Sequence, residues 1–169
     1  QMDLAFKVAN RLVQRKQRGE FSKMGSTLSA LIVRGDRALI GHVGDSRIYR
    51  YRGDELEQLT ADHSLAATMK AAGIEGNGSF GHVILKAIGM SEEPPDIISQ
   101  RVEPFDRYLL CTDGLTDVMD EEFIAKALAE LPASEVCTTL VEETLARGGE
   151  DNITALLVEI RPENPCEHP

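Results

Sequence analysis

The feature that most constrains the fold of this chain is a change of hydrophobic periodicity near residue 27. Before it, apolar side chains recur every three or four positions, which predicts an amphipathic helix that ends at Gly19. From residue 28 to residue 59 four short apolar runs follow one another, separated by turns such as Gly35-Asp36 and Gly53-Asp54. Tight turns join antiparallel strands, so we expect a four-stranded antiparallel meander and no parallel doubly wound sheet. The residues that carry the helical repeat are Leu4, Ala5, Val8, Ala9, Leu12 and Val13.

The rest of the chain mixes helices with further strands. The patterns predict helices at residues 64–72, 120–131 and 132–147, and strands at residues 97–102, 108–112 and 152–160. Residues 75–82 hold three glycines and few apolar side chains, which is typical of a loop. The order predicts an α+β sandwich: one domain over residues 1–160 and a proline-containing tail over residues 161–169.

The charge composition of the chain limits the kinds of molecule that we expect it to bind. The 169 residues suit one domain, and 28 acidic against 18 basic side chains give a formal net charge of −10. Such a surface repels phosphate backbones and anionic lipid, so we expect neither nucleic acid nor membrane as a partner. No apolar stretch approaches the roughly 18 residues of a spanning helix, and the first residues lack a signal-peptide pattern, so the expected location is cytoplasmic.

The three cysteines are far apart and fit neither a zinc site nor a disulfide framework. Cys111 follows the apolar run Tyr108-Leu109-Leu110, where we expect a buried, reduced thiol and not a catalytic nucleophile.

Four aspartates stand just past expected strands or turns and beside glycine or one another: Asp45, Asp113, Asp117 and Asp151. Strand ends can converge in space, and Asp117 would share a face with Asp113 if a helical turn begins there. Converging carboxylates repel one another unless a hard divalent cation lies among them, and oxygen-only ligands suit Mg²⁺, Mn²⁺ or Ca²⁺ better than Zn²⁺. The spacing therefore suggests a metal site made of these four side chains.

Each residue also has a plainer interpretation. A lone aspartate of this kind can serve a turn or a helix cap, and we expect that role for Asp36, Asp54 and Asp62. We expect His63 to make a loop hydrogen bond and not to transfer protons, and Arg47 to pair with a carboxylate.

Six short motifs decide between these interpretations. In order they are Met24-Gly25-Ser26-Thr27, Gly41-His42-Val43-Gly44-Asp45-Ser46-Arg47, Leu59-Thr60-Ala61-Asp62-His63-Ser64, Ala87-Ile88-Gly89, Leu110-Cys111-Thr112-Asp113-Gly114-Leu115-Thr116-Asp117 and Gly148-Gly149-Glu150-Asp151-Asn152-Ile153-Thr154. Together they resemble the metal-dependent protein phosphatases, the type 2C serine/threonine phosphatases, and most of all their bacterial members. The resemblance implies a β-sandwich of two antiparallel sheets flanked by helices.

The resemblance also implies roles. Asp113 and Asp151 match family aspartates that hold a pair of Mn²⁺ or Mg²⁺ ions, whose bridging water attacks phosphorus in line. Asp45 and Asp117 match residues that join Asp113 at a third, weaker metal site. The implied partners are phosphorylated proteins, the products of serine/threonine kinases, and no side chain other than the metal ligands is assigned to catalysis. Asn152 and Thr154 are expected to shape the turn of Asp151.

One family motif is not found within these 169 residues. The family places an Asp-Gly-x-Gly-Gly before its first helix, and the aspartate bridges both catalytic metals. We therefore expect the chain as given to be an N-terminally incomplete, inactive fragment that self-associates through uncovered sheet edges. Two alternatives stay open: a non-catalytic binding module that keeps the fold, and a phosphatase-like regulator in a partner-switching pathway.

Overall fold

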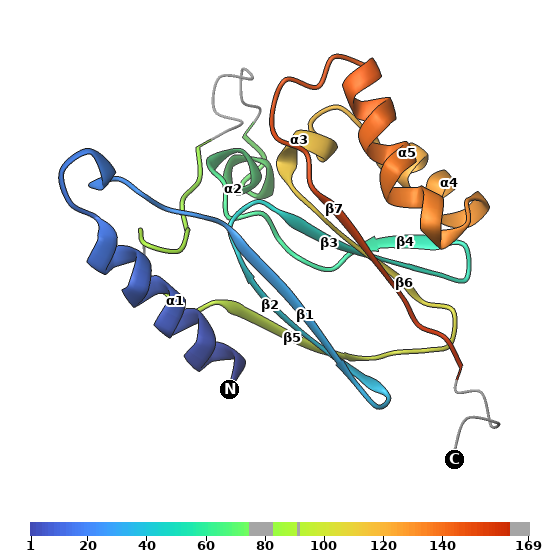
Figure 1. The fold of residues 1–169 in the computed structure, drawn as a ribbon, viewed down its shortest axis with the longest axis horizontal. Helices are drawn as coiled ribbons and strands as arrows, with labels where there is room; N and C mark the ends of the chain where they lie inside the picture. The colour runs from blue at the N-terminus through green and yellow to red at the C-terminus, as the bar shows by residue number, and fades with distance from the viewer. Residues whose placement is uncertain (75–82, 91, 163–169) are drawn as a thin grey trace.

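The computed structural model describes residues 1–74, 83–90 and 92–162, and it shows two antiparallel sheets with helices on their outer faces (Figure 1). The first sheet has the order β1-β2-β5 and the second the order β4-β3-β6-β7. This arrangement confirms the predicted α+β sandwich. The strands are β1 (Leu28–Arg34), β2 (Arg37–Val43), β3 (Arg47–Arg52), β4 (Glu55–Gln58), β5 (Asp96–Arg101), β6 (Arg107–Cys111) and β7 (Ala155–Glu159).

The helices lie where the sequence pattern predicted them. Helix α1 packs against β2 of the first sheet, while α4 and α5 cover the second (Figure 1). Ser64 caps α2, because its hydroxyl accepts a hydrogen bond from the Ala67 amide at 3.2 Å. The helices are α1 (Met2–Lys16), α2 (Leu65–Ala71), α3 (Asp113–Thr116), α4 (Glu121–Glu130) and α5 (Ala133–Ala146), with a 3₁₀ turn at Gly19–Phe21.

The predicted four-stranded meander is wrong. Strands β1 and β2 pair with each other, as do β3 and β4, but β2 and β3 belong to different sheets. The chain crosses from one sheet to the other at Gly44, whose φ of +116° lies outside the range that side-chain-bearing residues readily adopt. The crossing brings the segment that carries Asp45 to the end of both sheets.

Both faces of the central strands are buried, which explains their apolar content. On β2, Ala38, Ile40 and His42 are fully buried, while Leu39 and Val43 alternate with them and pack in the cluster that includes Phe6 of α1. On the second sheet, Tyr49 and Leu109 pack against α4 and α5. The sandwich is therefore built as four layers, helix, sheet, sheet and helices.

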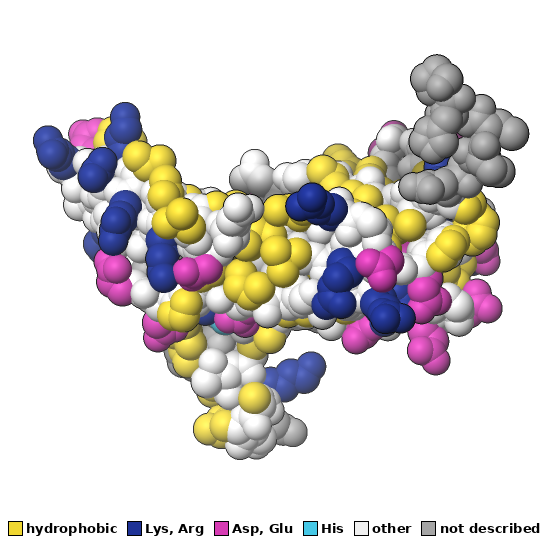
Figure 2. Space-filling model, turned by 90° about the horizontal axis from the view of Figure 1, so that it is seen from below, with side chains coloured by type: hydrophobic (Ala, Val, Ile, Leu, Met, Phe, Trp, Pro, Cys, Tyr) yellow, Lys and Arg dark blue, Asp and Glu magenta, His cyan; other side chains and the backbone are white. Residues whose placement is uncertain are grey.

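Helix α1 buries only part of its predicted apolar repeat, since Ala9 and Val13 pack against the core while the other side of the repeat faces outward. Met2, Phe6 and Asn10 are buried, whereas Leu4, Val8 and Leu12 are 63%, 48% and 55% exposed. Basic side chains gather around this helix, at the left of Figure 2. The exposed leucines leave an apolar strip on an otherwise charged helix.

Two further expectations concern cysteines and membrane spans. Cys111 is a buried free thiol, as expected, and burial raises its pKa to about 12, which disfavours the thiolate form. Across the part of the chain that the structure describes, no helix combines the length and the apolar content needed to cross a membrane.

Candidate metal centre

Asp45 lies at the crossing between the two sheets. Its side chain is almost buried, with 8% of the residue exposed. A Cβ atom on the preceding Gly44 would lie 2.4 Å from the Thr27 methyl carbon, so only glycine fits this approach. The Thr27 and Ser46 hydroxyls, 2.8 Å apart, link the residue before β1 to the residue after Asp45.

Asp113 and Asp117 are held by the single turn of α3. The Asp117 amide donates to the Asp113 carbonyl at 2.8 Å, which confirms the expected helical turn and puts both side chains on one side of it. The Asp113 carboxylate accepts a hydrogen bond from the Gly114 amide at 2.9 Å. Asp113 follows β6 directly, so the sheet and the turn together orient it.

Asp151 reaches the same region from the turn before β7. A Cβ atom on Gly114 would lie 2.6 Å from the Asn152 carbonyl oxygen and 3.4 Å from the Asp151 Cβ, so Gly114 lets the two segments touch. Thr112 links the two segments by hydrogen bonds. Its hydroxyl donates to the Asn152 carbonyl at 3.1 Å and accepts from the Thr154 amide at 3.0 Å. Asp151 itself accepts from the Asn152 amide at 2.6 Å.

The structure brings three of the four predicted aspartates into one pocket of about 570 Å³. Asp45, Asp113 and Asp117 line it, with Lys70 of α2 among the other lining residues. Asp151 is exposed and does not line this pocket, although it adjoins Asp113 through Gly114. The arrangement is thus an acidic pocket with a fourth carboxylate beside it.

The electrostatics of the pocket favour a cation. Burial raises the pKa of Asp45 above its usual range, and the neighbouring charges of Asp113, Asp62 and Asp117 raise it further. A divalent ion among these side chains would remove that repulsion, and their oxygen atoms are ligands that Mn²⁺ and Mg²⁺ accept. Within the described residues, no three His, Cys, Asp or Glu side chains are already close enough to enclose an ion. The donor types therefore fit such ions, and the carboxylates would have to draw together around one.

Arg47 and Asp62 form an ion pair in the same pocket. The Arg47 Nη2 and Nε atoms lie 2.7 Å and 3.0 Å from the two Asp62 oxygens. This pairing confirms the expected role of Arg47, whose pKa lies above its ordinary value because hydrogen bonds to Asp62 and Tyr49 outweigh the effect of burial. The turn or cap role expected for Asp62 is wrong, since its carboxylate faces Arg47; Asp36 and Asp54 do lie in turns.

Sequence reasoning missed several residues around the pocket. His63 makes a loop hydrogen bond, as expected, but its partner Asp96 lies 33 residues away and carried no motif. Lys86, which pairs with Asp96, and Lys70 gave no signal either. Thr112 stood inside a recognised motif, yet its role as a link between two strand ends needs the fold to be seen.

Comparison with known sequences adds a family. A family model described as protein phosphatase 2C matches residues 3–157. The serine/threonine protein phosphatase PstP of Mycobacterium tuberculosis is 32% identical over 166 residues, which cover 94% of this chain and 32% of PstP. Protein phosphatase PhpP of Streptococcus pneumoniae is 36% identical over 148 residues, 83% of this chain and 60% of PhpP. The chain thus spans less than two thirds of either relative.

Solved structures agree with the sequence relatives. The crystal structure of Mycobacterium tuberculosis PstP superposes with a TM-score of 0.89 at 30% identity, over 95% of this chain and 71% of that one. A PstP catalytic domain in complex with 2 manganese ions gives a TM-score of 0.85 at 32% identity, over 94% and 70% of the two chains. Since the family model spans nearly the whole sandwich and these relatives share its fold, the chain belongs to the protein phosphatase 2C family.

Proposed function

We propose that this chain forms the larger part of a metal-dependent protein serine/threonine phosphatase. The observation that carries the proposal is the convergence of Asp45, Asp113 and Asp117 on one pocket, with Asp151 beside Asp113. Four carboxylates without matching cations are costly to hold together, and a divalent ion offsets that cost. The relatives are named as phosphatases, and one of their structures holds manganese, which supports the same assignment.

The roles that we propose for the four aspartates are those that the family resemblance implies. Asp113 and Asp151, which follow β6 and precede β7, would hold Mn²⁺ or Mg²⁺, and Asp45 and Asp117 would complete a third, weaker site with Asp113. When bound, the ions supply an activated water and neutralise charge that develops on the phosphate group. The ion pair with Asp62 holds the Arg47 guanidinium against the pocket wall, so we do not assign Arg47 to substrate binding. Substrates would be cytoplasmic proteins phosphorylated on serine or threonine.

The same proposal includes a requirement for another carboxylate. Two divalent ions held by neighbouring carboxylates would repel each other strongly unless a further anion lay between them. The family supplies that anion from an Asp-Gly-x-Gly-Gly segment, and none of the 169 residues matches it. We therefore expect these 169 residues alone to bind at least one ion weakly and to turn over little substrate.

Phosphate release from a phosphothreonine peptide with millimolar Mn²⁺ tests the proposal. The 169-residue chain alone should release almost none, whereas the chain supplied with the Asp-Gly-x-Gly-Gly segment of PstP, fused or as a separate chain, should turn over. Asp113→Ala in the fused protein should remove that activity. A fused protein that binds Mn²⁺ and stays inactive would instead indicate a non-catalytic binding module. A rate from the isolated chain equal to that of the fused one would show that the bridging carboxylate has a substitute here.

A further inference from the structure

We propose that His63 is a positioning residue for Asp45, acting through both backbone groups of Gly44. The Gly44 amide donates to His63 Nδ1 at 3.0 Å, and the His63 amide donates to the Gly44 carbonyl at 2.8 Å. We call this reciprocal pair of hydrogen bonds the clamp, because it fixes the backbone of the residue directly before Asp45. The inference rests on the proposed function, since it concerns how one of the proposed metal ligands is held.

The hydrogen bonds determine the tautomer of His63. A backbone N–H only donates, so Nδ1 must accept and carries no proton; the ring proton is then on Nε2. Nε2 lies 3.1 Å from Asp96 Oδ2, to which it donates. One face of the ring stacks on His42, with ring centroids 5.0 Å apart. His42 is itself buried and is held by the Ser29 hydroxyl at 2.9 Å and the Ala61 carbonyl at 3.1 Å.

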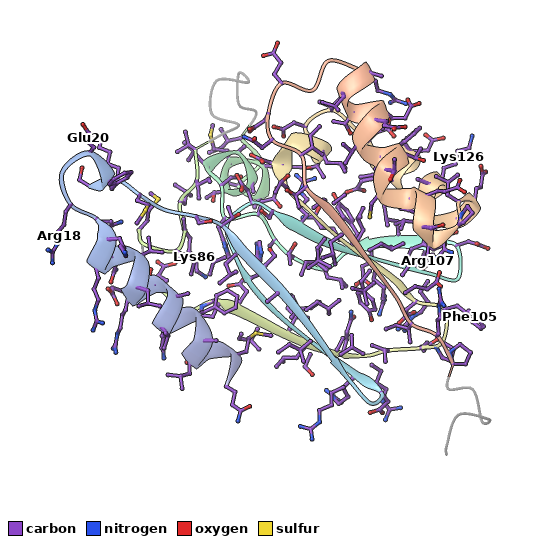
Figure 3. All side chains as sticks on the ribbon, viewed as in Figure 1. Arg18, Glu20, Lys86, Phe105, Arg107 and Lys126 are labelled. Carbon is purple, nitrogen blue, oxygen red and sulfur yellow. The ribbon has the colours of Figure 1, made fainter. Side chains whose placement is uncertain are left out.

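Asp96 is anchored from the other side by Lys86. The Lys86 ammonium lies 3.0 Å from Asp96 Oδ1, and only 8% of Lys86 is exposed. Burial alone would raise the pKa of Asp96, but hydrogen bonds from Lys86 and His63 outweigh it and hold the pKa below its usual range, so this carboxylate stays charged. Lys86 lies between α1 and the first sheet, at the end where the strands approach the pocket (Figure 3).

Gly44 is a backbone position that needs such a clamp. Its φ of +116° is available to glycine alone, and glycine is also the residue with the most alternative conformations to lose. Thr27 packs against Gly44, and His63 bonds both its amide and its carbonyl, so close packing and hydrogen bonds together restrict this backbone. The hydrogen bonds between His63 and Gly44 therefore determine where Asp45 enters the pocket, and Asp96 with Lys86 contributes by holding the imidazole in the tautomer that accepts from Gly44. Partners of this outer kind typically change metal affinity by about 10- to 100-fold.

Two near-isosteric substitutions separate the two ring nitrogens. In His63→Asn the side-chain oxygen takes the place of Nδ1 and can still accept from Gly44, but nothing reaches Asp96. In His63→Gln the amide NH₂ takes the place of Nε2 and can still donate to Asp96, but the Gly44 amide loses its acceptor. If Gly44 is the point of control, Mn²⁺ titration by calorimetry should give the wild-type dissociation constant for Asn and one about tenfold higher or more for Gln.

General destabilisation is controlled with Asp106→Asn, which removes a buried ion pair remote from the pocket and should leave Mn²⁺ affinity unchanged. Equal affinities for wild type, His63→Asn and His63→Gln would overturn the positioning role. The reverse order, with Asn weak and Gln unchanged, would also overturn it and assign the effect to Asp96. A wild type that binds no Mn²⁺ would remove the proposed function and leave the hydrogen bonds between His63 and Gly44 to be tested without metal.

A second readout needs no metal. Two-bond ¹H–¹⁵N correlation spectra should show His63 protonated on Nε2 alone, and the Gly44 amide should exchange with solvent faster in His63→Gln than in His63→Asn. A His63 protonated on Nδ1 would overturn the clamp whatever the metal titrations give. With the Nε2 tautomer confirmed and no Mn²⁺ bound, the clamp would stand as structure and the proposed function alone would have failed.

Discussion

The carboxyl group of Asp45 lowers the stability of the folded chain when it is ionised and no cation is bound. Burial and the charge of Asp113 raise its pKa in the folded chain. A raised folded-state pKa contributes stability that is fully present below the ordinary carboxyl pKa and is lost as pH rises through the folded value. At neutral pH without divalent cations, Asp45 therefore opposes folding.

Asp45→Asn should accordingly make the chain more stable than wild type at pH 7 in a chelator, because it removes a poorly solvated charge. The gap should close as pH falls below the ordinary carboxyl range. With saturating Mn²⁺ the order should reverse, since only the wild type keeps the ligand. Urea unfolding at several pH values measures all three results. Asp36→Asn, on an exposed turn, is the control. If Asp45→Asn were less stable than wild type in the chelator, the ionised Asp45 carboxylate would not oppose folding.

The sequence predicted which side chains lie at the site better than it predicted which other side chains they contact. The Asp113 and Asp117 spacing implied a shared helical turn, which a local backbone hydrogen bond produces. Asp62 was misread because a carboxylate beside a helix start is as good a cap as Ser64, and the choice depends on Arg47 across the pocket. His63 and Asp96 meet only because β5 lies beside β2, a pairing with no local signal.

Among the elements, β3 and the turn before β6 are joined by a buried ion pair. The Arg52 guanidinium places two nitrogens 2.6 Å from the two Asp106 oxygens, and Asp106 is 1% exposed. Burial would raise the pKa of Asp106, but the Arg52 hydrogen bonds outweigh it and lower the pKa. Its stabilising contribution is therefore present above the ordinary carboxyl pKa and is lost as pH falls through the lower folded value.

Asp106→Asn should lower the free energy of unfolding by about 3 kcal/mol, because it removes the buried one of the two carboxylates that pair with Arg52. Glu103→Gln is a matched control, since Glu103 also contacts Arg52, at 2.7 Å, but its side chain is 59% exposed. That exposed pair should contribute about 0–1 kcal/mol. Urea unfolding at pH 7 gives both values, and equal losses in the two variants would show that burial does not set the strength of these pairs.

The contact between α3 and the turn of Asp151 depends on Gly114. In Gly114→Ala the new methyl group would lie 2.6 Å from the Asn152 oxygen, so the two segments must separate. We expect a loss of about 1–3 kcal/mol in stability and a smaller Mn²⁺-induced rise in Tm than in wild type. Asp151→Asn removes the ligand without the clash and should lose only the Mn²⁺ response. A Gly114→Ala variant with the full response would show that Asp151 does not depend on this approach.

Strand positions were predictable from alternation, but one pairing was not. The β1–β2 and β3–β4 hairpins follow from their turns, whereas the chain switches sheets at Gly44. Nothing in a residue pattern distinguishes a tight turn from a sheet crossing when both contain glycine, because the difference lies in which distant strand each side meets.

On the scale of the whole molecule, edge strands of both sheets carry exposed apolar side chains. Ile32 of β1 is 52% exposed and Leu156 of β7 is 51% exposed, and each strand is the last of its sheet. Open edges of this kind pair with other chains. We expect the 169-residue chain to associate as its concentration rises, and Ile32→Lys with Leu156→Lys to reduce the association. Ile74→Lys, equally exposed but outside the strands, should have no effect. Light scattering that reports a monomer at all concentrations would contradict the edge argument.

The pocket at the joined ends of the two sheets should bind divalent cations through Asp113 and its neighbours. A calorimetric Mn²⁺ titration of the wild type and of Asp113→Ala, with Tm measured on the same samples, tests it directly. Asp113 is the proposed ligand of more than one ion. We therefore predict saturable Mn²⁺ binding and a raised Tm for the wild type, and neither for Asp113→Ala. Identical isotherms and identical Tm shifts for the two proteins would contradict the claim.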